Sequence, residues 1–298
     1  MLGQITKKST HKIVKATGLR SISRSSMRMG GDGHHQHYVF EGDFSRKWVT
    51  GLAIGVVGGG VAYLLTIMSK YHVLCLHGYR QNGLKLRGRL AAYRRAFKSK
   101  MEFACFDGPI SVPYAPTNEE HSKRVCEGEE VATNQFSWWD FDIDEQTGKH
   151  TYSRVNETID YIAKLCKEHG PFDGILGFSQ GGMLAMMLLQ LQTAKLKEHG
   201  LQFKFGIFIA AGISQDGSYN WSNLDGMLLD IPTVHIMGRN DAVVSIERSE
   251  MLAQAFLNPI VFIHEGGHYI PANKEPKDIL RDFYDKIIVK LEASSSLN

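Results

Sequence analysis

The sequence predicts an α/β fold, a mostly parallel and doubly wound sheet, preceded by one transmembrane helix. From residue 71 onwards, apolar runs alternate with amphipathic helical patterns, which is typical of a parallel sheet with helices on both faces. Ahead of this region, 22 residues between Lys47 and Lys70 carry no charge. The length of 298 residues and the hydrophobic fraction of 43% are ordinary for a globular chain.

The N-terminal part is basic, in contrast to the rest of the chain. Residues 1–31 hold seven Lys or Arg, several Ser and Thr and no acid, which is the composition of a mitochondrial targeting segment. A disordered basic tail is the alternative. The first 47 residues carry a net charge of +6 and the remaining 251 residues carry −3. The globular part therefore lacks the basic footprint of a nucleic-acid-binding domain, and no nucleic acid is expected as a partner.

Residues 32–47 are expected to form a linker. The histidine-rich tract at 31–37 has no recognisable second ligand cluster elsewhere in the sequence, so we expect no metal site. The four cysteines show neither a CxxC pair nor a Cys/His metal spacing, which favours reduced thiols. No metal and no organic cofactor are expected.

Residues 48–68 are predicted to form the transmembrane helix. At about 1.5 Å per residue, the uncharged stretch reaches roughly 33 Å, enough for a hydrocarbon core of about 30 Å. Gly51, Gly55 and Gly59 recur every four residues on one helix face, which favours a helix–helix partner in the membrane. The mitochondrial inner membrane is the expected location, or the cytoplasm if residues 1–70 are absent from the mature protein.

Two other structures are alternatives for this stretch. A buried core helix is one of them. A dinucleotide-binding turn in VVGGGVA fails on spacing, because Tyr63 occupies the third glycine position and Arg80 stands where an acid is needed.

One domain, residues 71–293, is expected after the span, with a short tail at 294–298. The strands are expected at 71–76, 102–106, 172–178, 203–211, 231–237 and 259–263. The helices are expected at 83–99, 152–169, 181–198, 245–257 and 275–292. Residues 107–151 break this rhythm, and we expect a long polar loop with a functional role there.

The segment GFSQG, residues 177–181, carries the central chemical motif. Gly-x-Ser-x-Gly alone is a weak signal, but here it follows an apolar strand and opens an apolar helix. That context predicts a nucleophile elbow, a sharp strand-to-helix turn that exposes the Ser179 hydroxyl above the sheet.

A serine hydroxyl needs a base and an acid that orients the base. In this fold they follow the serine in the order acid, then histidine. Asp241 comes directly after the strand at 231–237, whereas Asp216, Asp225 and Asp230 fall in a polar segment between strands. These three aspartates are therefore weaker candidates for the orienting acid.

For the base, His268 follows two glycines on a loop that can reach the sheet edge, and His264 lies nearer the last strand. We therefore expect Asp241 and His268 to act with Ser179, and His264 to pack or cap.

An oxyanion hole needs two preorganised N–H groups. One is expected from Gln180, the residue after the nucleophile, and the other from Tyr79, just past Gly78 in the segment LHGYRQN. His77 is expected to brace that loop rather than to take part in catalysis.

Six segments in this order resemble one family: LHGYRQN, FDGP, FSWWDFD, GILGFSQGG, GRNDAVV and GGHYIP. They are similar to the serine hydrolases related to the ovarian cancer-associated gene 2 protein, over residues 71–291. The resemblance implies an α/β-hydrolase fold, a Ser179–His268–Asp241 triad and a small-molecule carboxylic ester as substrate. A hydrophobic pocket would favour lipidic esters. The same machinery suits thioesters. Trp138 and Trp139 are expected either to line an acyl pocket or to pack under the loop.

Residues 1–70 are similar to something else, the small single-span subunits of cytochrome c oxidase of the subunit seven type. The alternative function is therefore a respiratory-complex subunit fused to, or wrongly joined with, a hydrolase. A pseudoenzyme that serves as a binding module is disfavoured, because every triad position is filled.

Overall fold

The computed structural model describes residues 70–114, 134–193, 201–219 and 228–295 of the chain. The predicted targeting segment, linker and span at residues 1–68 lie outside these ranges, so they stay predictions. In the ranges that are described, none of the helices combines the length and the apolar character that a membrane crossing requires.

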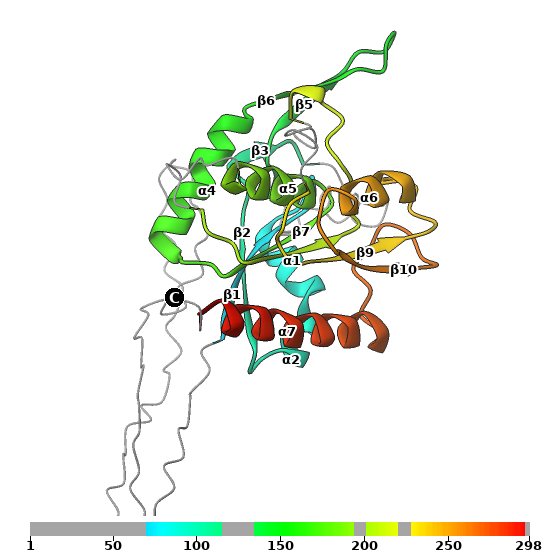
Figure 1. Ribbon diagram of the computed structural model, residues 1–298. Coiled ribbons are helices and arrows are strands. Elements are labelled where there is room, and N and C mark those ends of the chain that lie inside the picture. Colours follow the sequence, from blue (N-terminus) through cyan, green and yellow to red (C-terminus); the bar gives the residue numbers. More distant parts are fainter. Residues whose placement is uncertain (1–69, 115–133, 194–200, 220–227, 296–298) are drawn as a thin grey trace, which may run out of the picture. The chain divides into compact units, whose positions relative to one another are not determined.

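A six-stranded parallel sheet forms the centre of the domain (Figure 1). The strand order across the sheet is β10-β9-β8-β7-β1-β2, and every neighbouring pair runs parallel. The strands are β1 (Tyr71–Leu76), β2 (Met101–Phe106), β7 (Gly174–Phe178), β8 (Phe205–Ile209), β9 (Thr233–Gly238) and β10 (Ile260–His264). All six predicted strands are present with ends shifted by two residues at most, so the predicted parallel α/β class is confirmed.

Parallel strands start at one edge of the sheet and end at the other. β1 starts at Tyr71, whose N–H donates to the carbonyl of Lys100 over 2.9 Å, and ends at Leu76. Every segment singled out for chemistry follows the end of a strand, so these segments gather at one edge.

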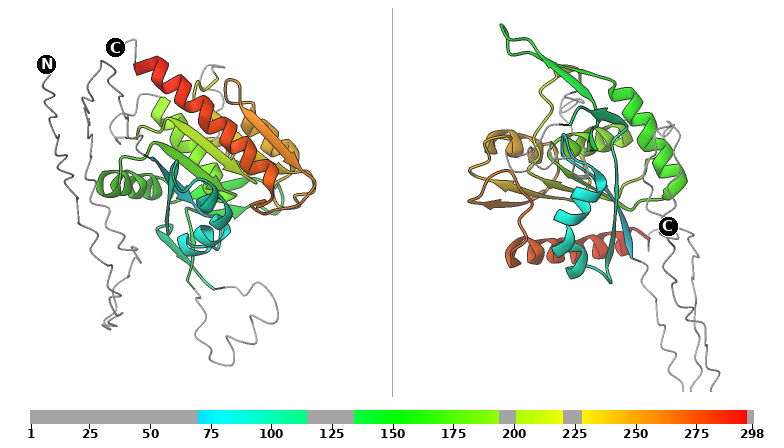
Figure 2. Two further views of the ribbon diagram at one scale, coloured as in Figure 1. Left: turned by 90° about the horizontal axis from the view of Figure 1, so that it is seen from below. Right: turned by 180° about the vertical axis from the view of Figure 1, so that it is seen from behind.

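Helices cover both faces of the sheet, as Figures 1 and 2 show. On β1, Leu74 and Leu76 point into one core and Val73 and Cys75 into the other, as the alternation of a strand requires. The first core is closed by α4 (Val155–His169), α5 (Gln180–Thr193) and α6 (Ile246–Ala253). The second is closed by α1 (Gly83–Arg89), α2 (Ala91–Ala96) and α7 (Lys274–Ser295).

The single helix predicted at 83–99 is wrong, because the structure divides it into α1 and α2. The break falls at Leu90, with φ −80° and ψ 4°, which follows the C-terminal turn of α1 that contains Gly88. Glycine is a poor helix former, since its backbone loses the most freedom on folding. The two short helices can therefore follow different directions over the sheet.

The described parts of residues 107–151 are more structured than predicted. β3 (Ile110–Val112) pairs with β4 (Gln135–Ser137), and β5 (Asp140–Ile143) forms a hairpin with β6 (His150–Ser153), both antiparallel. The helix expected from residue 152 starts at Val155, because residues 150–153 form β6.

The hairpin is held by the segment after β8. The Tyr152 N–H donates to the buried Asp216 carboxylate over 2.7 Å, and the Tyr152 hydroxyl accepts from the N–H of Gln215.

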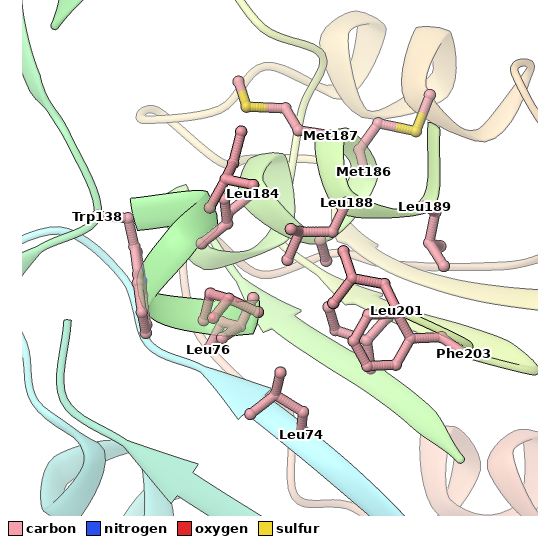
Figure 3. Close-up of a cluster of buried hydrophobic side chains, with 14 of the residues drawn as sticks. Leu74, Leu76, Trp138, Leu184, Met186, Met187, Leu188, Leu189, Leu201 and Phe203 are labelled. Atoms are coloured by element: carbon pink, nitrogen blue, oxygen red, sulfur yellow. The ribbon is translucent and has the colours of Figure 1, made fainter. Parts of the chain in front are cut away.

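Apolar side chains of α5 fill the space between this helix and the sheet (Figure 3). Leu184 and Leu188 are fully buried in the cluster that also holds Leu74 and Leu76 of β1. Trp138 belongs to the same cluster and stands beside Leu76 and the first turn of α5. The segment 137–139 is thereby packed onto the part of the molecule that carries the motif GFSQG.

Candidate active site

Ser179 lies at the turn between β7 and α5. Its φ of 54° is in the left-handed region, where non-glycine residues are uncommon and which functional turns often use. The Ser179 N–H donates to the carbonyl of Ile209 at the end of β8 over 3.1 Å. A side chain at Gly177 would collide with the backbone of Gly181, so the strand and the helix meet too closely for any larger residue. This is the strained strand-to-helix turn expected of a nucleophile elbow.

The loop after β1 is packed directly against that turn. A Cβ at Gly181 would lie 2.6 Å from the carbonyl oxygen of His77 and still closer to that of Leu76. A Cβ at Gly78 would lie 3.0 Å from the ring of Phe178. Glycines at these two places let the loop that contains Tyr79 approach the N-terminus of α5, where the first N–H groups have no partner within the helix.

His77 braces this loop from a fully buried position. Its Nε2 accepts the N–H of Gly108 over 2.9 Å, so Nδ1 carries the proton and donates to the carbonyl of Gly78 over 2.8 Å. Burial lowers the pKa of His77 from 6.5 to about 4, against the opposing effect of the Gly78 hydrogen bond. The imidazole is thus neutral at physiological pH, which suits the structural role predicted for it.

Trp138 and Gln180 form further hydrogen bonds that hold the loop after β1. The indole Nε1 of Trp138 donates to the carbonyl of His77 over 2.7 Å. The Gln180 side chain accepts the N–H of Trp138 through Oε1 and donates to the carbonyl of Trp139 through Nε2, over 3.1 and 3.3 Å. Sequence reasoning placed only the backbone of Gln180 in the site and missed this second use of its side chain.

The two tryptophans are core residues. Trp138 is 0% exposed and Trp139 is 1% exposed, which leaves almost no surface on which an acyl chain could pack. Trp139 contacts the ring of Tyr152 with 5.1 Å between ring centroids. Of the two roles considered from the sequence, the geometry favours packing under the loop over lining of an acyl pocket.

Asp241 and His268 meet at the same edge of the sheet. His268 Nδ1 lies 2.7 Å from Asp241 Oδ2, a distance typical of a charge-assisted hydrogen bond. With Nδ1 donating to the carboxylate, Nε2 is left to accept a proton. The His268 ring also lies 5.0 Å from the ring of Phe178, the residue before Ser179. The structure therefore brings His268 to the turn that carries the serine.

His264 has a different surrounding. Its Nδ1 accepts the N–H of Gly266 over 3.1 Å, and its ring contacts that of Tyr269. Partial burial lowers the pKa of His264, and the nearby carboxylates of Asp241 and Glu265 oppose this shift. His264 shapes the loop that carries His268, as predicted from its place near the strand. Asp216, one of the three weaker candidates for the acid, instead accepts the N–H of Tyr152 and so holds the β5–β6 hairpin.

Two further groups at this site were not found from the sequence. Arg248 of α6 donates through Nη2 to the carbonyl of Ile213 over 2.9 Å and lies against the sulfur of Met183. Lys85 and Arg89 of α1 lie on the opposite face of the sheet, with the Arg89 guanidinium over the ring of Phe178. Among the residues that the structure describes, no group of His, Cys, Asp or Glu could hold a metal ion.

The chain is similar to known proteins over most of its length. Residues 67–279 match the protein family described as "Serine hydrolase (FSH1)". The esterase OVCA2 of Danio rerio is 34% identical over 221 residues, 71% of this chain and 95% of that protein. The esterase OVCA2 of Xenopus tropicalis is 31% identical over 228 residues, 72% of this chain and 93% of that protein. The esterase CG5412 of Drosophila melanogaster is 32% identical over 225 residues, 74% of this chain and 75% of that protein.

Proposed function

The chain belongs to the FSH1 family of serine hydrolases, and we propose that it hydrolyses carboxylic esters through a triad of Ser179, His268 and Asp241. The observation that carries this proposal is the meeting of two features at one sheet edge. Ser179 occupies a left-handed turn with φ 54°, and the hydrogen-bonded His268–Asp241 pair reaches that turn through Phe178. Three relatives named as esterases support an ester as the substrate.

The geometry supports the following steps. His268 Nε2 takes the proton of the Ser179 hydroxyl as its oxygen attacks the ester carbonyl, and Asp241 stabilises the imidazolium that forms. The N–H groups of Gln180 and Tyr79 donate to the oxyanion of the tetrahedral intermediate. His268 then protonates the leaving alcohol, which departs with its bonding electrons, and an acyl-enzyme remains. Water, deprotonated by the same histidine, attacks the acyl-enzyme and releases the acid and Ser179.

The packing of the loops supports a preorganised site. His77 hydrogen-bonds to Gly78 and Gly108, and the Trp138 indole donates to the carbonyl of His77, so the loop that carries Tyr79 is held in place. Oxyanion donors act best when they need no rearrangement during the reaction. A thioester would undergo the same steps with a thiol as the leaving group.

A fluorophosphonate probe tests the nucleophile. It should label the full-length protein and fail to label Ser179→Ala, with loss of ester turnover in the same variant. Ser214→Ala is the matched control, because Ser214 follows β8 at the same sheet edge and hydrogen-bonds to the Asp216 carbonyl. Labelling that persists in Ser179→Ala would overturn the assignment.

The membrane part of the prediction concerns residues outside the described ranges. We keep the span at 48–68, its helix partner through Gly51, Gly55 and Gly59, and the mitochondrial location as proposals. The family match starts at residue 67, so nearly all of residues 1–70, which the alternative assigns to a respiratory subunit, lies outside it. Carbonate extraction tests the span: the full chain should stay with membranes, and a chain that starts at Lys70 should be released.

A further inference from the structure

The segment that forms α1 and α2 is strongly basic. Residues 80–100 contain eight Lys or Arg and no Asp or Glu, in a chain whose residues 48–298 carry a net charge of −3. Such a local excess of one charge next to a site favours binding of the opposite charge. Which ligand these Lys and Arg side chains could bind depends on where they lie relative to Ser179 and His268.

Two contacts place α1 and α2 beside the histidine of the proposed triad. The Arg89 guanidinium carbon lies 5.5 Å from the centroid of the Phe178 ring, and that ring lies 5.0 Å from the ring of His268. The Tyr93 hydroxyl of α2 donates to the carbonyl of Pro271, three residues after His268, over 2.8 Å. The Arg89 guanidinium thus lies on the His268 side of the site.

Lys85 and Arg89 stand one helical turn apart and carry the same charge. Partial burial lowers the pKa of both side chains, and the charge of Arg89 lowers that of Lys85 further. In the part of the chain that the structure describes, neither of them forms an ion pair. Several other cations do, and Lys100, Arg154 and Lys204 each pair with a carboxylate.

Like charges at this spacing destabilise a helix. Lys85 is half-buried and Arg89 is exposed, so solvent can reach both cations. An anion bound between the two side chains would offset their mutual repulsion.

The reaction determines which part of a substrate would lie there. His268 delivers its proton to the leaving group, so the leaving alcohol or thiol must lie beside the histidine. We propose that Lys85 and Arg89 bind an anionic group, a phosphate or a carboxylate, on the leaving alcohol or thiol of the substrate. This inference rests on the proposed function, because it requires the leaving group to lie next to His268.

The two residue types suit this task. The planar guanidinium of Arg89 can donate two parallel hydrogen bonds to a phosphate or carboxylate, and the Lys85 ammonium supplies a flexible point charge. Both charges remain available because no acid of the described residues neutralises them. The acyl part of the substrate lies on the other side of the reacting carbonyl and is unaffected by this pair.

Three esters with one acyl group test the inference on the full-length protein. Phenyl butyrate has a neutral leaving group, 4-butyryloxyphenyl phosphate carries a phosphate, and 4-butyryloxyphenylacetate carries a carboxylate. In Lys85→Gln/Arg89→Gln, the ratio of kcat/KM for an anionic ester to kcat/KM for phenyl butyrate should fall about tenfold, the size expected for lost charge-assisted hydrogen bonds. A fall with the phosphate alone identifies the group as a phosphate, and a fall with the carboxylate alone identifies a carboxylate.

The control removes the same number of charges from the same segment. Arg95→Gln/Lys98→Gln changes two exposed cations at α2 and just beyond it, and the ratio should stay within about twofold of the wild-type value. A second measurement needs no variant: raising the salt from about 0.05 to about 0.5 M should lower the ratio for wild type, because salt screens exposed charges.

Each failure has its own signature. An unchanged ratio in Lys85→Gln/Arg89→Gln, or a ratio in wild type that does not respond to salt, would overturn the anion site while ester turnover and probe labelling of Ser179 persist. If the proposed function is wrong, wild type will hydrolyse none of the three esters and the fluorophosphonate will not label it.

Discussion

His268 Nδ1 lies 2.7 Å from Asp241 Oδ2, while the other oxygen of the same carboxylate accepts the N–H groups of Val243 and Val244 over 2.8 and 2.9 Å. Asp241 therefore has two functions: it orients the histidine and it holds the loop after β9. Its carboxylate is almost fully buried, with 1% of the side chain exposed. The two functions can be separated by substitution.

Asp241→Asn should lower kcat by about 10³-fold or more, because an amide cannot stabilise the imidazolium. The amide oxygen can still accept from Val243 and Val244, so the melting temperature should change little. Asp241→Ala should lower both kcat and the melting temperature, since it leaves the N–H groups of Val243 and of the buried Val244 without their acceptor. Steady-state kinetics and thermal unfolding measure the two effects. Equal melting temperatures for the two variants would contradict the second function.

His264→Ala and His268→Ala should have different effects on ester turnover. His268→Ala removes the proposed general base and should lower kcat by about 10³-fold or more. His264→Ala loses the hydrogen bond from Gly266, worth about 1 kcal/mol, and should keep most of its activity. Ester kinetics at saturating substrate decides between them. Loss of turnover in His264→Ala with retention in His268→Ala would reverse the assignment of the base.

Gly181→Ala should destabilise the protein by about 1–3 kcal/mol, because its Cβ would meet the backbone carbonyls of Leu76 and His77. It should also lower kcat, since the loop with Tyr79 must move to make room. Gly88→Ala is the control: its Cβ meets nothing within 4 Å, and removing a glycine from a helix stabilises by up to about 1 kcal/mol. Urea unfolding and ester kinetics provide the measurements, and similar values for both variants would count against the close approach.

Trp138→Phe and Trp139→Phe remove similar volumes from the same core. Only the first removes the hydrogen bond to the carbonyl of His77, so Trp138→Phe should lower kcat about tenfold, the effect of roughly 1.4 kcal/mol lost from preorganisation. KM should stay nearly constant. Trp139→Phe should lower stability through lost packing against Tyr152 and leave kcat near wild type. If both variants lose stability without a difference in kcat, Trp138 has a packing role alone.

His235 should make stability depend on pH. Burial lowers its pKa from 6.5 to about 3. Below pH 6.5, His235 therefore binds a proton in the unfolded chain but stays neutral in the folded protein until the pH approaches 3. The free energy of unfolding of wild type therefore falls as the pH is lowered from about 6.5 towards 4. His235→Gln has no such proton, so its deficit relative to wild type should shrink by up to about 1.4 kcal/mol per pH unit. Urea titrations at several pH values test this, and a constant difference would refute it.

The central strands were predictable because their signal is local. β7 and β8 are buried along their whole length, as GILGF and FGIFI, and such short apolar runs between helical patterns indicate a parallel sheet. Asp241 and His268 were predictable for a related reason, since each follows one of these strands and the strand ends share an edge.

The β5–β6 hairpin was not predictable in this way. Its strands, DFDI and HTYS, have four residues each and are mostly exposed, so neither has a clear apolar face. Their position depends on Asp216, which accepts the Tyr152 N–H across 64 residues of sequence. The same holds for Arg89: its spacing from Lys85 is visible in the sequence, but its place over Phe178 depends on the order of strands in the sheet.

The first residue of β1 lies at the sheet edge opposite the site, where the Tyr71 N–H donates to Lys100. Six residues of strand, about 20 Å at 3.3 Å each, separate this entry point from the loop that carries Tyr79. The chain ahead of Lys70 therefore joins the domain at the edge opposite Ser179. A tether attached through that segment would leave the loops that carry Tyr79 and Ser179 without direct attachment to it.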